Sequence, residues 1–317
     1  MAEASYPECD TLIVGAGLCG LVAGGALQRA RQRVLLLDKG RGVGGRMATR
    51  RLADGAVADH GAQFFTTRDP RFAALAEDWR AQGLIREWTR GFSEPFDGHP
   101  RWCGVVSMNA IAKQLARGLD CRTQSEVRSV EPQSGAWRVT LAAGEVLRAR
   151  AVLLSAPLPQ SRALLVPPWS DRVPAIEYER CIAVMARLAR PSRVPEPGAL
   201  QLESGELSFV ADNQRKGISA VPCLTLHGSA EFSLRHWDLE RRAAGHALLR
   251  AASAWIEGAI LDFEVHGWRY AKPESVHPER CVVLSSDPRL VLGGDAFAGP
   301  RVEGAVLSGL AAAEALA

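Results

Sequence analysis

Residues 11–20 read TLIVGAGLCG, four strand-forming residues followed by three glycines in the spacing G-x-G-x-x-G. The small residues that follow predict a helix to about Arg31, and VLLL at 34–37 predicts a second strand that ends at Asp38. A strand, a glycine turn, a helix and a strand in this order are typical of the unit that binds dinucleotides. A glycine-rich turn without a ligand is the alternative.

The glycines and the acid have different parts in such a unit. Gly15 permits the tight turn, Gly17 lets the backbone approach a pyrophosphate, and Gly20 lets the helix pack on the strand. The helix N-terminus offers free amide N–H groups to the phosphates. Asp38, which follows Gly15 by 23 residues, is placed to accept hydrogen bonds from ribose hydroxyls and to repel a ribose 2′-phosphate. We therefore expect a bound adenine dinucleotide other than NADP.

A second glycine cluster follows the acid directly. Residues 41–49 read RGVGGRMAT, with a cation on each side of the glycines. A simple nicotinamide-binding domain continues into an ordinary crossover at this point, so the cluster favours FAD over NAD. The alternative is a basic surface loop.

Composition limits the other possibilities. The 317 residues, 47% hydrophobic and 23% charged, suffice for two globular domains, and the net charge of +3 predicts no nucleic-acid surface. Seven cysteines without a C-x-x-C spacing predict neither disulfides nor a metal site. The first ten residues lack an export signal and no stretch of 18 apolar residues occurs, so we expect a cytoplasmic protein without a membrane partner.

The middle of the chain changes in pattern. Helices are expected over 73–90, 107–119 and 238–255, and turns over 91–104. Short strands are expected at 137–141, 146–154, 182–188, 207–211, 223–227 and 260–266. The chain then returns to the first style, with a strand at 290–292, Gly294-Asp295 and a helix from about 302 to the end. The pattern predicts an α/β domain interrupted by a mixed sheet.

Three motifs in this order resemble the flavin-containing amine oxidase superfamily: the glycine turn with its acid, the G-G-R at 44–46, and RVEGAVLSG at 301–309 after Gly294-Asp295. In that superfamily the aspartate faces the ribityl chain and pyrophosphate. The last helix points its N-terminus at the pyrimidine edge of the flavin, where reduced flavin carries negative charge.

Within the superfamily, the chain is similar to the renalase family and especially its bacterial members. The similar blocks are DKGRGVGGRM at 38–47, DHGAQFFT at 59–66, DNQRK at 212–216, His227 and WRY at 268–270. The block WCGVVSM at 102–108 departs from the family, because a Pro-Gly is expected before the methionine.

The resemblance implies a Rossmann-like FAD-binding domain of the GR2 type with an inserted α+β mixed-sheet substrate domain. The FAD-binding domain would comprise 1–72, 103–160 and 272–317, and the substrate domain 73–102 and 161–271, with the active site between them. FAD would be noncovalent, since no cysteine matches the flavin-tethering cysteine of monoamine oxidases. The implied cofactor-binding residues are Gly15, Gly17, Leu18, Cys19, Gly20, Asp38, Lys39, Arg41, Gly45, Arg46, Ala62, Gln63, Phe64, Val127, Gly294, Asp295, Arg301, Val302, Glu303 and Ala305.

The resemblance also implies a reaction. Renalases oxidise 2- or 6-dihydroNAD(P), isomers reduced at the wrong ring carbon, to NAD(P)+ by hydride transfer to flavin N5, with O2 as the electron acceptor. Such a substrate is already a hydride donor, so no catalytic side chain is expected. The expected substrate-pocket residues are Gln63, His227, Asn213, Trp268 and Tyr270, and a plain structural role is the alternative for each of them. Two other functions remain open: an FAD-dependent amine oxidase or dehydrogenase acting on another small donor, and a non-enzymatic flavin-binding regulatory protein.

Overall fold

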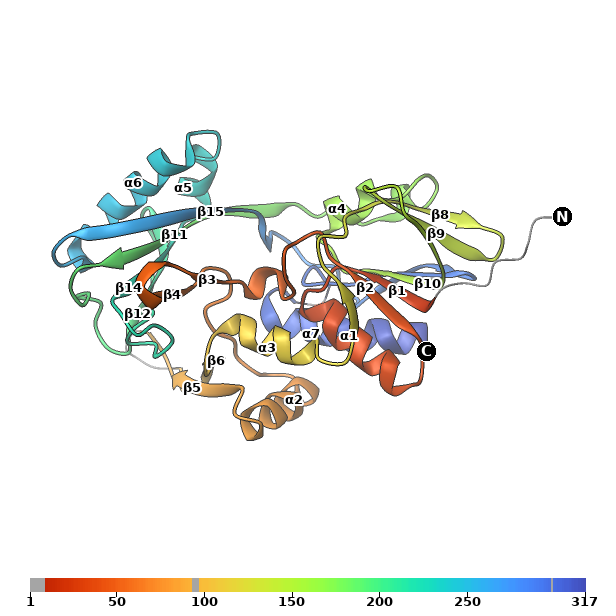
Figure 1. Cartoon of the computed structure of the whole chain (residues 1–317), viewed down its shortest axis with the longest axis horizontal. Coiled ribbons are helices and arrows are strands. Elements are labelled where there is room, and N and C mark those ends of the chain that lie inside the picture. Colours follow the sequence, from red (N-terminus) through yellow and green to blue (C-terminus); the bar gives the residue numbers. More distant parts are fainter. Residues whose placement is uncertain (1–8, 93–96, 298) are drawn as a thin grey trace. The chain divides into compact units, whose positions relative to one another are not determined.

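The computed structural model describes residues 9–92, 97–297 and 299–317 (Figure 1). The chain divides into two compact units, each built from separate stretches of sequence. Met1–Gly45, Ala112–Glu177 and Pro273–Ala317 form the first unit, and Arg46–Ile111 and Tyr178–Lys272 form the second. These breaks differ from the expected breaks after residues 72, 102 and 160, whereas the expected break after 271 lies one residue from the break after Lys272. The function of each part stays a prediction.

The first unit is built on an eight-stranded sheet. Its main order is β16-β17-β10-β1-β2-β7, with the hairpin of β8 and β9 attached to β10. The four strands β17, β10, β1 and β2 and the short β7 run parallel, and the helix α1 forms the crossover between β1 and β2. The strands are β1 Cys9–Val14, β2 Val34–Leu37, β7 Asp120–Arg122, β8 Val127–Gln133, β9 Ala136–Leu141, β10 Val146–Leu154, β16 Val282–Ser286 and β17 Arg289–Leu292.

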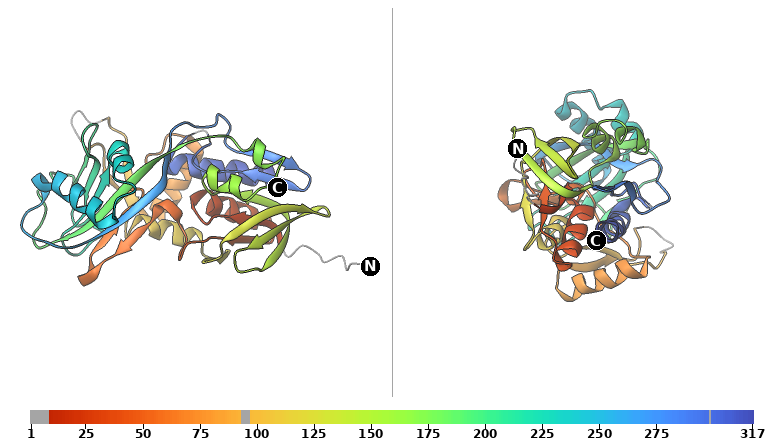
Figure 2. Two further views of the ribbon diagram at one scale, coloured as in Figure 1. Left: turned by 90° about the horizontal axis from the view of Figure 1, so that it is seen from above. Right: turned by 90° about the vertical axis from the view of Figure 1, so that its right-hand side faces the viewer.

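Two long helices from opposite ends of the chain lie side by side against this sheet. They are α1 (Leu18–Arg29) and α7 (Arg301–Leu316) (Figure 2). Small residues let them approach closely: a Cβ added at Gly309 would lie 2.5 Å from the carbonyl oxygen of Cys19. The short helix α4 (Leu158–Ala163) follows β10. The Ala/Gly-rich composition of both long helices therefore serves their contact.

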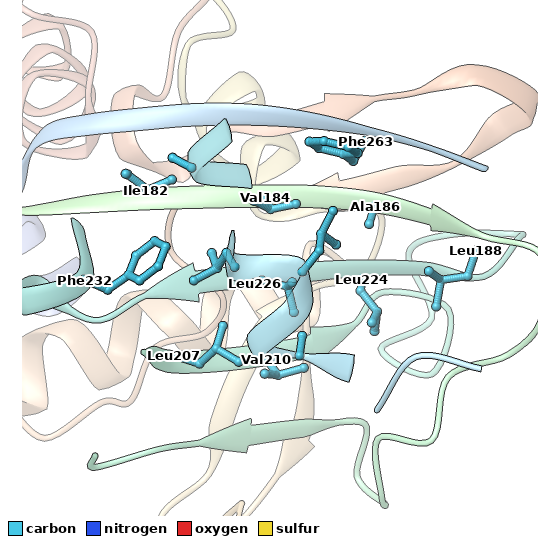
Figure 3. Close-up of a cluster of buried hydrophobic side chains, with 14 of the residues drawn as sticks. Ile182, Val184, Ala186, Leu188, Leu207, Val210, Leu224, Leu226, Phe232 and Phe263 are labelled. Atoms are coloured by element: carbon cyan, nitrogen blue, oxygen red, sulfur yellow. The ribbon is translucent and has the colours of Figure 1, made fainter. Parts of the chain in front are cut away.

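The second unit contains a five-stranded sheet in the order β12-β13-β14-β11-β15. Its strands are β11 Tyr178–Leu188, β12 Ala199–Gln201, β13 Leu207–Asp212, β14 Cys223–Gly228 and β15 Ile260–Pro273. Two helices, α5 (Ala230–Arg235) and α6 (Arg241–Ala251), cover one face with a core of Val, Leu, Ile and Phe side chains (Figure 3). The unit also contains two hairpins and the helix α2 (Pro70–Ala81): the strands are β3 Thr49–Arg51, β4 Val57–Asp59, β5 Ile85–Thr89 and β6 Arg101–Gly104. The helix α3 (Met108–Leu115) begins in this unit, and its residues from Ala112 onward belong to the first unit.

Two sequence-based boundaries are wrong. The helix expected over 73–90 ends at Ala81, because Gly83 turns the chain at φ +69° and the following residues pair as β5 with β6. The expected turn-rich stretch accordingly ends in the strand Arg101–Gly104. Cross-strand pairing overrides the helical periodicity here.

The long helix expected over 238–255 is likewise divided. The Glu240 carboxylate accepts hydrogen bonds from the N–H groups of Arg242 (2.9 Å) and Ala243 (2.8 Å). Glu240 is thus the N-cap, and α6 begins at Arg241. The helix ends at Ala251, and a 3-10 turn follows over Ser253–Trp255. The α/β class with an inserted mixed sheet is confirmed. Among the helices of the described ranges, none combines the length and apolar character that a bilayer crossing requires.

Candidate functional site

The glycine turn of the first unit leaves space beside its second glycine. Gly15 has φ +109°, and a Cβ there would lie 2.7 Å from Ser155 Oγ. A Cβ on Gly20 would lie 2.0 Å from the Gly15 carbonyl oxygen, so this position also requires glycine. No described atom comes within 4 Å of a Cβ at Gly17. The protein itself therefore leaves this space, where the sequence predicted that a pyrophosphate approaches.

The first turn of α1 adjoins this space. Gly17 is the N-cap of this helix. The first amide N–H groups of the helix, such as those of Leu18 and Cys19, are not capped by any described side chain. Amides of this kind and the positive end of the helix dipole stabilise a bound anion. The turn thus fits a phosphate group.

Hydrogen bonds of Asp38 and Ala16 connect the two glycine-rich segments. Asp38 Oδ2 accepts the Ala16 N–H (2.8 Å) and Asp38 Oδ1 accepts the Gly40 N–H (2.7 Å). The Gly44 N–H in turn donates to the Ala16 carbonyl (2.7 Å). A carboxylate has about four acceptor positions, so Asp38 keeps acceptor capacity for ribose hydroxyls. Of the other residues predicted in this segment, Lys39, Arg41 and Gly45 are exposed.

The C-terminal motif lies in the same unit. Gly294 has φ +135° and donates its N–H to Ser308 Oγ (2.9 Å), while Asp295 beside it is 7% exposed. The helix α7 begins after Pro300, and no described side chain caps it.

Most of the predicted cofactor residues belong to the first unit. They are Gly15, Gly17, Leu18, Cys19, Gly20, Asp38, Lys39, Arg41, Gly45, Val127, Gly294, Asp295, Arg301, Val302, Glu303 and Ala305.

The Cys19 side chain serves helix packing. It is buried, with Sγ 3.9 Å from Ser308 Oγ of α7. Burial raises the pKa of this thiol to about 12, so it stays protonated and unreactive. Only the backbone of Cys19 remains to contact a cofactor.

Four predicted cofactor residues, Arg46, Ala62, Gln63 and Phe64, belong to the second unit. The Arg46 carbonyl accepts the Ala62 N–H (2.8 Å), and a Cβ on Gly61 would lie 1.9 Å from that carbonyl oxygen. The Arg46 guanidinium donates to the carbonyl of Tyr270 (3.1 Å) on β15. Arg46 and the segment that follows Asp59 are thus joined in one local structure.

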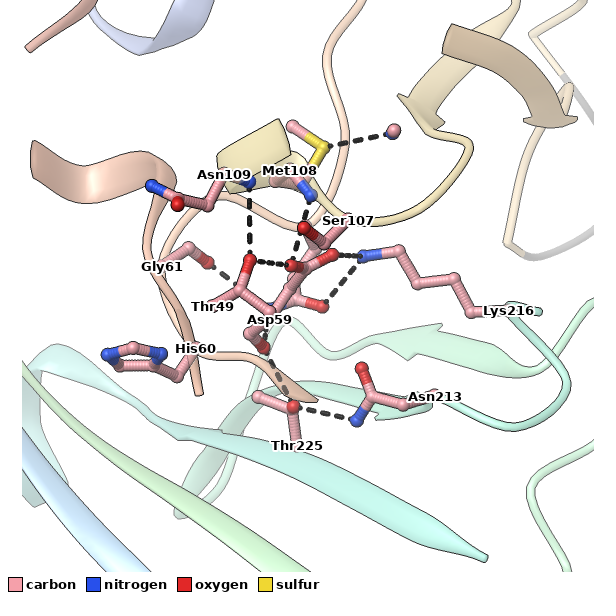
Figure 4. A network of polar contacts seen from close by, with 12 residues as sticks. Thr49, Asp59, His60, Gly61, Ser107, Met108, Asn109, Asn213, Lys216 and Thr225 are labelled. Atoms are coloured by element: carbon pink, nitrogen blue, oxygen red, sulfur yellow. Dashed lines mark hydrogen bonds and ion pairs between the residues drawn. The ribbon is translucent and has the colours of Figure 1, made fainter. Parts of the chain in front are cut away.

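A buried ion pair lies beneath that segment (Figure 4). Lys216 Nζ is 2.8 Å from Asp59 Oδ2, and both side chains are 0% exposed. Asp59 Oδ1 accepts the hydroxyl of Thr49 (2.6 Å) and the N–H of Met108 (3.1 Å). A buried carboxylate is tolerated only when it is paired and hydrogen-bonded in this way. Sequence reasoning quoted both residues within motifs but missed their pairing, although a fully buried lysine requires a partner.

Gln63 is held by the same group. Its Nε2 donates to the carbonyls of Asp59 (2.6 Å) and Gly61 (3.2 Å), and its Oε1 accepts from Lys216 Nζ (3.3 Å). The ammonium therefore fixes the orientation of the amide, because Nζ can only donate. The Gln63 side chain, predicted for both the flavin and the substrate, folds back on its own segment.

Asn213 is also part of the buried network. It is 0% exposed, and its Nδ2 donates to the Cys223 carbonyl (3.2 Å) and to Thr225 Oγ1 (2.9 Å). Thr225 in turn donates to the Asp59 carbonyl (2.8 Å). These bonds connect β14 to the Asp59 segment. The substrate-pocket role predicted for Asn213 stays a prediction.

Three histidines and a tryptophan gather on the other side of Asp59. The His60 ring stacks on Trp268 with centroids 5.4 Å apart and lies edge-on to His266 at 5.1 Å. The His60 carbonyl accepts from Trp268 Nε1 (2.8 Å) and from His227 Nε2 (3.1 Å). The predicted residues His227 and Trp268 therefore meet at one carbonyl oxygen. Sequence reasoning missed His60 and His266 as members of this cluster.

These histidines are neutral near physiological pH. Burial lowers the pKa of His60 to about 3 and the pKa of His227 to about 4. Burial also lowers the pKa of His266. Loss of water around an imidazolium disfavours the charged form.

Strand alternation places this cluster on one face of the five-stranded sheet. Phe263 and Val265 of β15 pack in the core under α6, so His266 and Trp268 project from the opposite face. His227 shares that face, since its neighbour Leu226 faces the core. We call the face that carries Phe209, Thr225, His227, His266 and Trp268 the site face. Tyr270 follows in the same alternation and packs edge-on against Tyr178 at 5.5 Å.

Aromatic rings adjoin His227 on the site face. The Phe209 ring lies 6.3 Å from the His227 ring and 5.9 Å from the Phe64 ring. Phe92 touches both phenylalanines, and Trp88 packs on Phe92 at 5.3 Å. Together they form an apolar cluster, largely buried, beside a neutral imidazole.

The fold and the glycine turn define a Rossmann-type dinucleotide-binding protein. The family profile described as NAD(P)-binding Rossmann-like domain matches residues 13–79, and the profile described as flavin containing amine oxidoreductase matches residues 96–317. The chain belongs to the flavin-containing amine oxidoreductase family. It is a renalase-like flavin oxidoreductase of that superfamily, as the motifs predicted.

Individual relatives agree with this family. Renalase of Mus musculus is 23% identical over 336 residues, which cover 96% of this chain and 98% of that protein. An L-amino acid dehydrogenase of Synechocystis sp. is 34% identical over 91 residues, covering 29% of this chain and 18% of that protein. A putative protoporphyrinogen oxidase from Exiguobacterium sp. 255-15 shares the fold with a TM-score of 0.72 at 13% identity, covering 98% of this chain and 99% of that one. Putrescine oxidase bound to putrescine shares the fold with a TM-score of 0.73 at 18% identity, covering 96% of this chain and 98% of that one.

Proposed function

We propose that the protein is a renalase-like oxidase that uses noncovalent FAD to oxidise 2- or 6-dihydroNAD(P) to NAD(P)+, with O2 as the electron acceptor. The proposal rests on similarity to a renalase along 96% of the chain, joined to the chemistry of the site face. The observation that carries it is that Asp59, the buried acid beside this face, is already paired with Lys216. A substrate bound there meets neutral groups.

The pairing can be followed residue by residue. Asp59 is bound by Lys216, and Glu264 of β15 lies 3.1 Å from Arg50. His60 and His227 are held neutral by burial, which lowers the pKa of each. A dihydropyridine already carries a transferable hydride, so its oxidation needs orientation by the protein rather than proton removal by a base.

The first unit contains the residues that would hold FAD. The space beside Gly17 and the uncapped first turn of α1 fit the pyrophosphate, and Asp38 retains acceptors for ribose. Asp295 and the start of α7 would face the ribityl chain and the flavin ring, by the family's pattern. Bound there, FAD supplies the acceptor for two electrons and passes them to O2.

The second unit contains the residues that would receive the substrate. The aromatic rings of Phe64 and Phe209 offer an apolar surface for a planar ring and exclude water from it. The carbonyl of His60 fixes Trp268 and His227 through two hydrogen bonds, so these rings keep one orientation. Positioning by rigid groups of this kind is what a direct transfer requires.

An amine oxidase is the second candidate, because the chain shares its fold with a putrescine oxidase. A buried cationic amine requires a carboxylate, because aromatic faces such as those of Phe64 and Phe209 return only about 0.5–2 kcal/mol of its large desolvation cost. Asp59 and Glu264, the acids beside the site face, already bind Lys216 and Arg50. The proposal therefore favours an uncharged reacting ring.

The test is anaerobic mixing of the flavin-loaded protein with borohydride-treated NAD+, with NADH and with a panel of amines while the flavin absorbance is followed. We expect rapid bleaching by the borohydride-derived isomers alone, followed by recovery of the colour on admission of air. Bleaching by amines would replace the proposal with the second candidate. Absence of bleaching by every donor would indicate a flavin-binding protein without turnover.

A further inference from the structure

The tautomer of His227 follows from its bond to His60. Its Nε2 lies 3.1 Å from the His60 carbonyl oxygen, and a carbonyl oxygen can only accept. The ring must therefore carry a proton on Nε2. The same oxygen also accepts from Trp268 Nε1 at 2.8 Å, so both of its lone pairs are used.

The opposite nitrogen of the ring is consequently an acceptor. Burial lowers the pKa of His227 to about 4 and the nearby Lys216 ammonium acts in the same direction, so the ring carries a single proton near neutrality. Because that proton is on Nε2, Nδ1 has a free lone pair. No residue of the described ranges forms a hydrogen bond with Nδ1, and the His227 side chain is only partly buried.

The surroundings of His227 restrict what can use this lone pair. The Phe209 ring, on the neighbouring strand, lies 6.3 Å from the His227 ring, and the Phe64 ring lies 5.9 Å from the Phe209 ring. A ligand bound at His227 therefore packs against aromatic rings. The ligand must also present an N–H or O–H donor to Nδ1. In a dihydronicotinamide, the ring nitrogen is substituted by ribose, and the carboxamide is the donor attached to the ring.

We infer that His227 is a specificity-determining residue whose Nδ1 accepts a hydrogen bond from the carboxamide N–H of a dihydronicotinamide substrate. This inference rests on the proposed function. It gives the second unit a means to distinguish nicotinamide dinucleotides from their nicotinic acid counterparts. A carboxylate has no proton to donate near neutral pH, and its negative oxygens are repelled by the lone pair of Nδ1.

A protonated amine could also donate to Nδ1, but its charge would remain. Asp59, the buried acid that the structure describes beside the cluster, is occupied by Lys216, and Glu264, which is 44% exposed, lies 3.1 Å from Arg50. An ammonium moved from water to this place would lack an anionic partner, which carries a large desolvation cost. The neutral carboxamide avoids that cost.

Two substitutions at His227 separate its two nitrogens. In His227→Gln the amide nitrogen reaches the position of Nε2 and can still donate to the His60 carbonyl, but the acceptor at Nδ1 is lost. In His227→Asn the amide oxygen stands near the position of Nδ1 and restores an acceptor, while the bond to His60 is lost. His99→Gln, at an exposed position, is the matched control.

The experiment measures dissociation constants of NAD+ and of nicotinic acid adenine dinucleotide from the change in the flavin spectrum of the holoenzyme. We expect wild type and His99→Gln to bind NAD+ about tenfold or more tightly than nicotinic acid adenine dinucleotide. A difference of this size is what the loss of one hydrogen bond to a buried polar group causes. His227→Gln is expected to lose most of that preference, and His227→Asn to keep it. An unchanged preference in His227→Gln would overturn the inference, even where the isomers are turned over.

A second measurement does not depend on turnover. Nitrogen NMR of the histidine rings, assigned by comparison with His227→Gln, identifies the protonated nitrogen. We expect His227 to be protonated on Nε2 alone at neutral pH, and its Nδ1 signal to move when NAD+ binds. A proton on Nδ1 would overturn the inference while leaving the proposed function intact. Failure of the holoenzyme to bind either dinucleotide, with bleaching by amines, would instead overturn the proposed function.

Discussion

Glycines 15, 17 and 20 share one turn, but the structure requires them for different reasons. Gly15 and Gly20 are required by the protein itself, since a Cβ would lie 2.7 Å from Ser155 Oγ at the first and 2.0 Å from the Gly15 carbonyl oxygen at the other. Gly17 is free of such contacts with described atoms and has φ −77°, which any residue adopts. Only a bound ligand gives Gly17 a steric reason to be glycine.

Gly17→Val is therefore expected to fold and to lose flavin. The added side chain would occupy the space predicted for the pyrophosphate, and no described protein atom lies within 4 Å of its Cβ. The measurement is flavin absorbance per mole of purified protein, with circular dichroism to establish folding. Gly25→Ala in the same helix is the control, because its Cβ would meet only the end of the Arg29 side chain at 3.5 Å. A yellow Gly17→Val protein would contradict this placement of the cofactor.

The Asp59–Lys216 pair makes a prediction for stability. Lys216→Met leaves a fully buried carboxylate without its cation, and we expect a loss of about 3–5 kcal/mol in the free energy of unfolding. Lys272→Met is the matched control: Lys272 Nζ is also 2.8 Å from a carboxylate, that of Glu179, but its side chain is 50% exposed. There we expect a loss of at most about 1 kcal/mol.

Chemical denaturation of both variants measures the difference. The double variant Asp59→Asn/Lys216→Met removes both charges, and we expect it to be more stable than Lys216→Met alone. Equal losses in the buried and the exposed lysine variants would contradict the role of the pair.

The neutral histidines make stability depend on pH. The pKa of His60 is about 3 in the folded protein and about 6.5 when unfolded, so the unfolded chain binds a proton that the folded protein does not bind. Stability is then unaffected above the unfolded pKa and falls as the pH drops from there toward 3, by about 1.4 kcal/mol per pH unit. His60→Phe retains a ring to stack on Trp268 and removes the titration. Urea unfolding across mildly acidic pH should show a smaller slope in His60→Phe, and identical slopes would show that His60 is not held neutral.

At the scale of elements, α1 and α7 show how distant segments are brought together. The carbonyl of Cys19 in α1 leaves room only for glycine at position 309 of α7. Gly293, at the end of β17, is close to the Cys19 sulfur in the same way, with a Cβ position 3.0 Å from Sγ. Small residues at these crossings bring Ser308 and Gly309 of α7 against Cys19 in the first turn of α1.

Gly309→Ala is expected to destabilise the first unit by about 1–3 kcal/mol. Its Cβ would lie 2.5 Å from the Cys19 carbonyl oxygen, a backbone atom that can move only with its helix. Gly25→Ala adds the same methyl group in open space and is expected to stabilise by up to about 1 kcal/mol. Thermal unfolding of both variants measures the contrast. A neutral Gly309→Ala would show that the two helices can separate without cost.

The elements also show where sequence patterns were sufficient. The first strands and α1 were predicted closely, because each has a local pattern of apolar and glycine residues. The hairpin of β5 with β6 was missed, since Ile85–Thr89 continues the helical spacing of the residues before it. The start of α6 was also misplaced, because the helical spacing extends to residue 238. The cap at Glu240 depends on the backbone conformation of that residue, which the spacing does not show.

At the scale of the whole molecule, the residues predicted to hold the cofactor fall largely within one unit. FAD that binds the folded first unit and not the unfolded chain would stabilise it by about 2.7 kcal/mol at a free concentration 100 times the dissociation constant. We expect added FAD to raise the unfolding temperature of apoprotein in proportion to the logarithm of its concentration. The same titration of Gly17→Val should leave the temperature unchanged. An equal rise in that variant would place the binding site elsewhere.

By itself, the amino-acid sequence determined the α/β class, the glycine turn with its acid, and membership of the flavin-dependent superfamily. Those features are read from residues close together in the chain. Only the tertiary structure decided that Lys216 neutralises Asp59, 157 residues away, and that Trp268 and His227 donate to the carbonyl of His60. Burial is the physical reason: a charge or a polar atom removed from water must find a partner, and the fold of the sheet, not the local sequence, determines which partner is within reach.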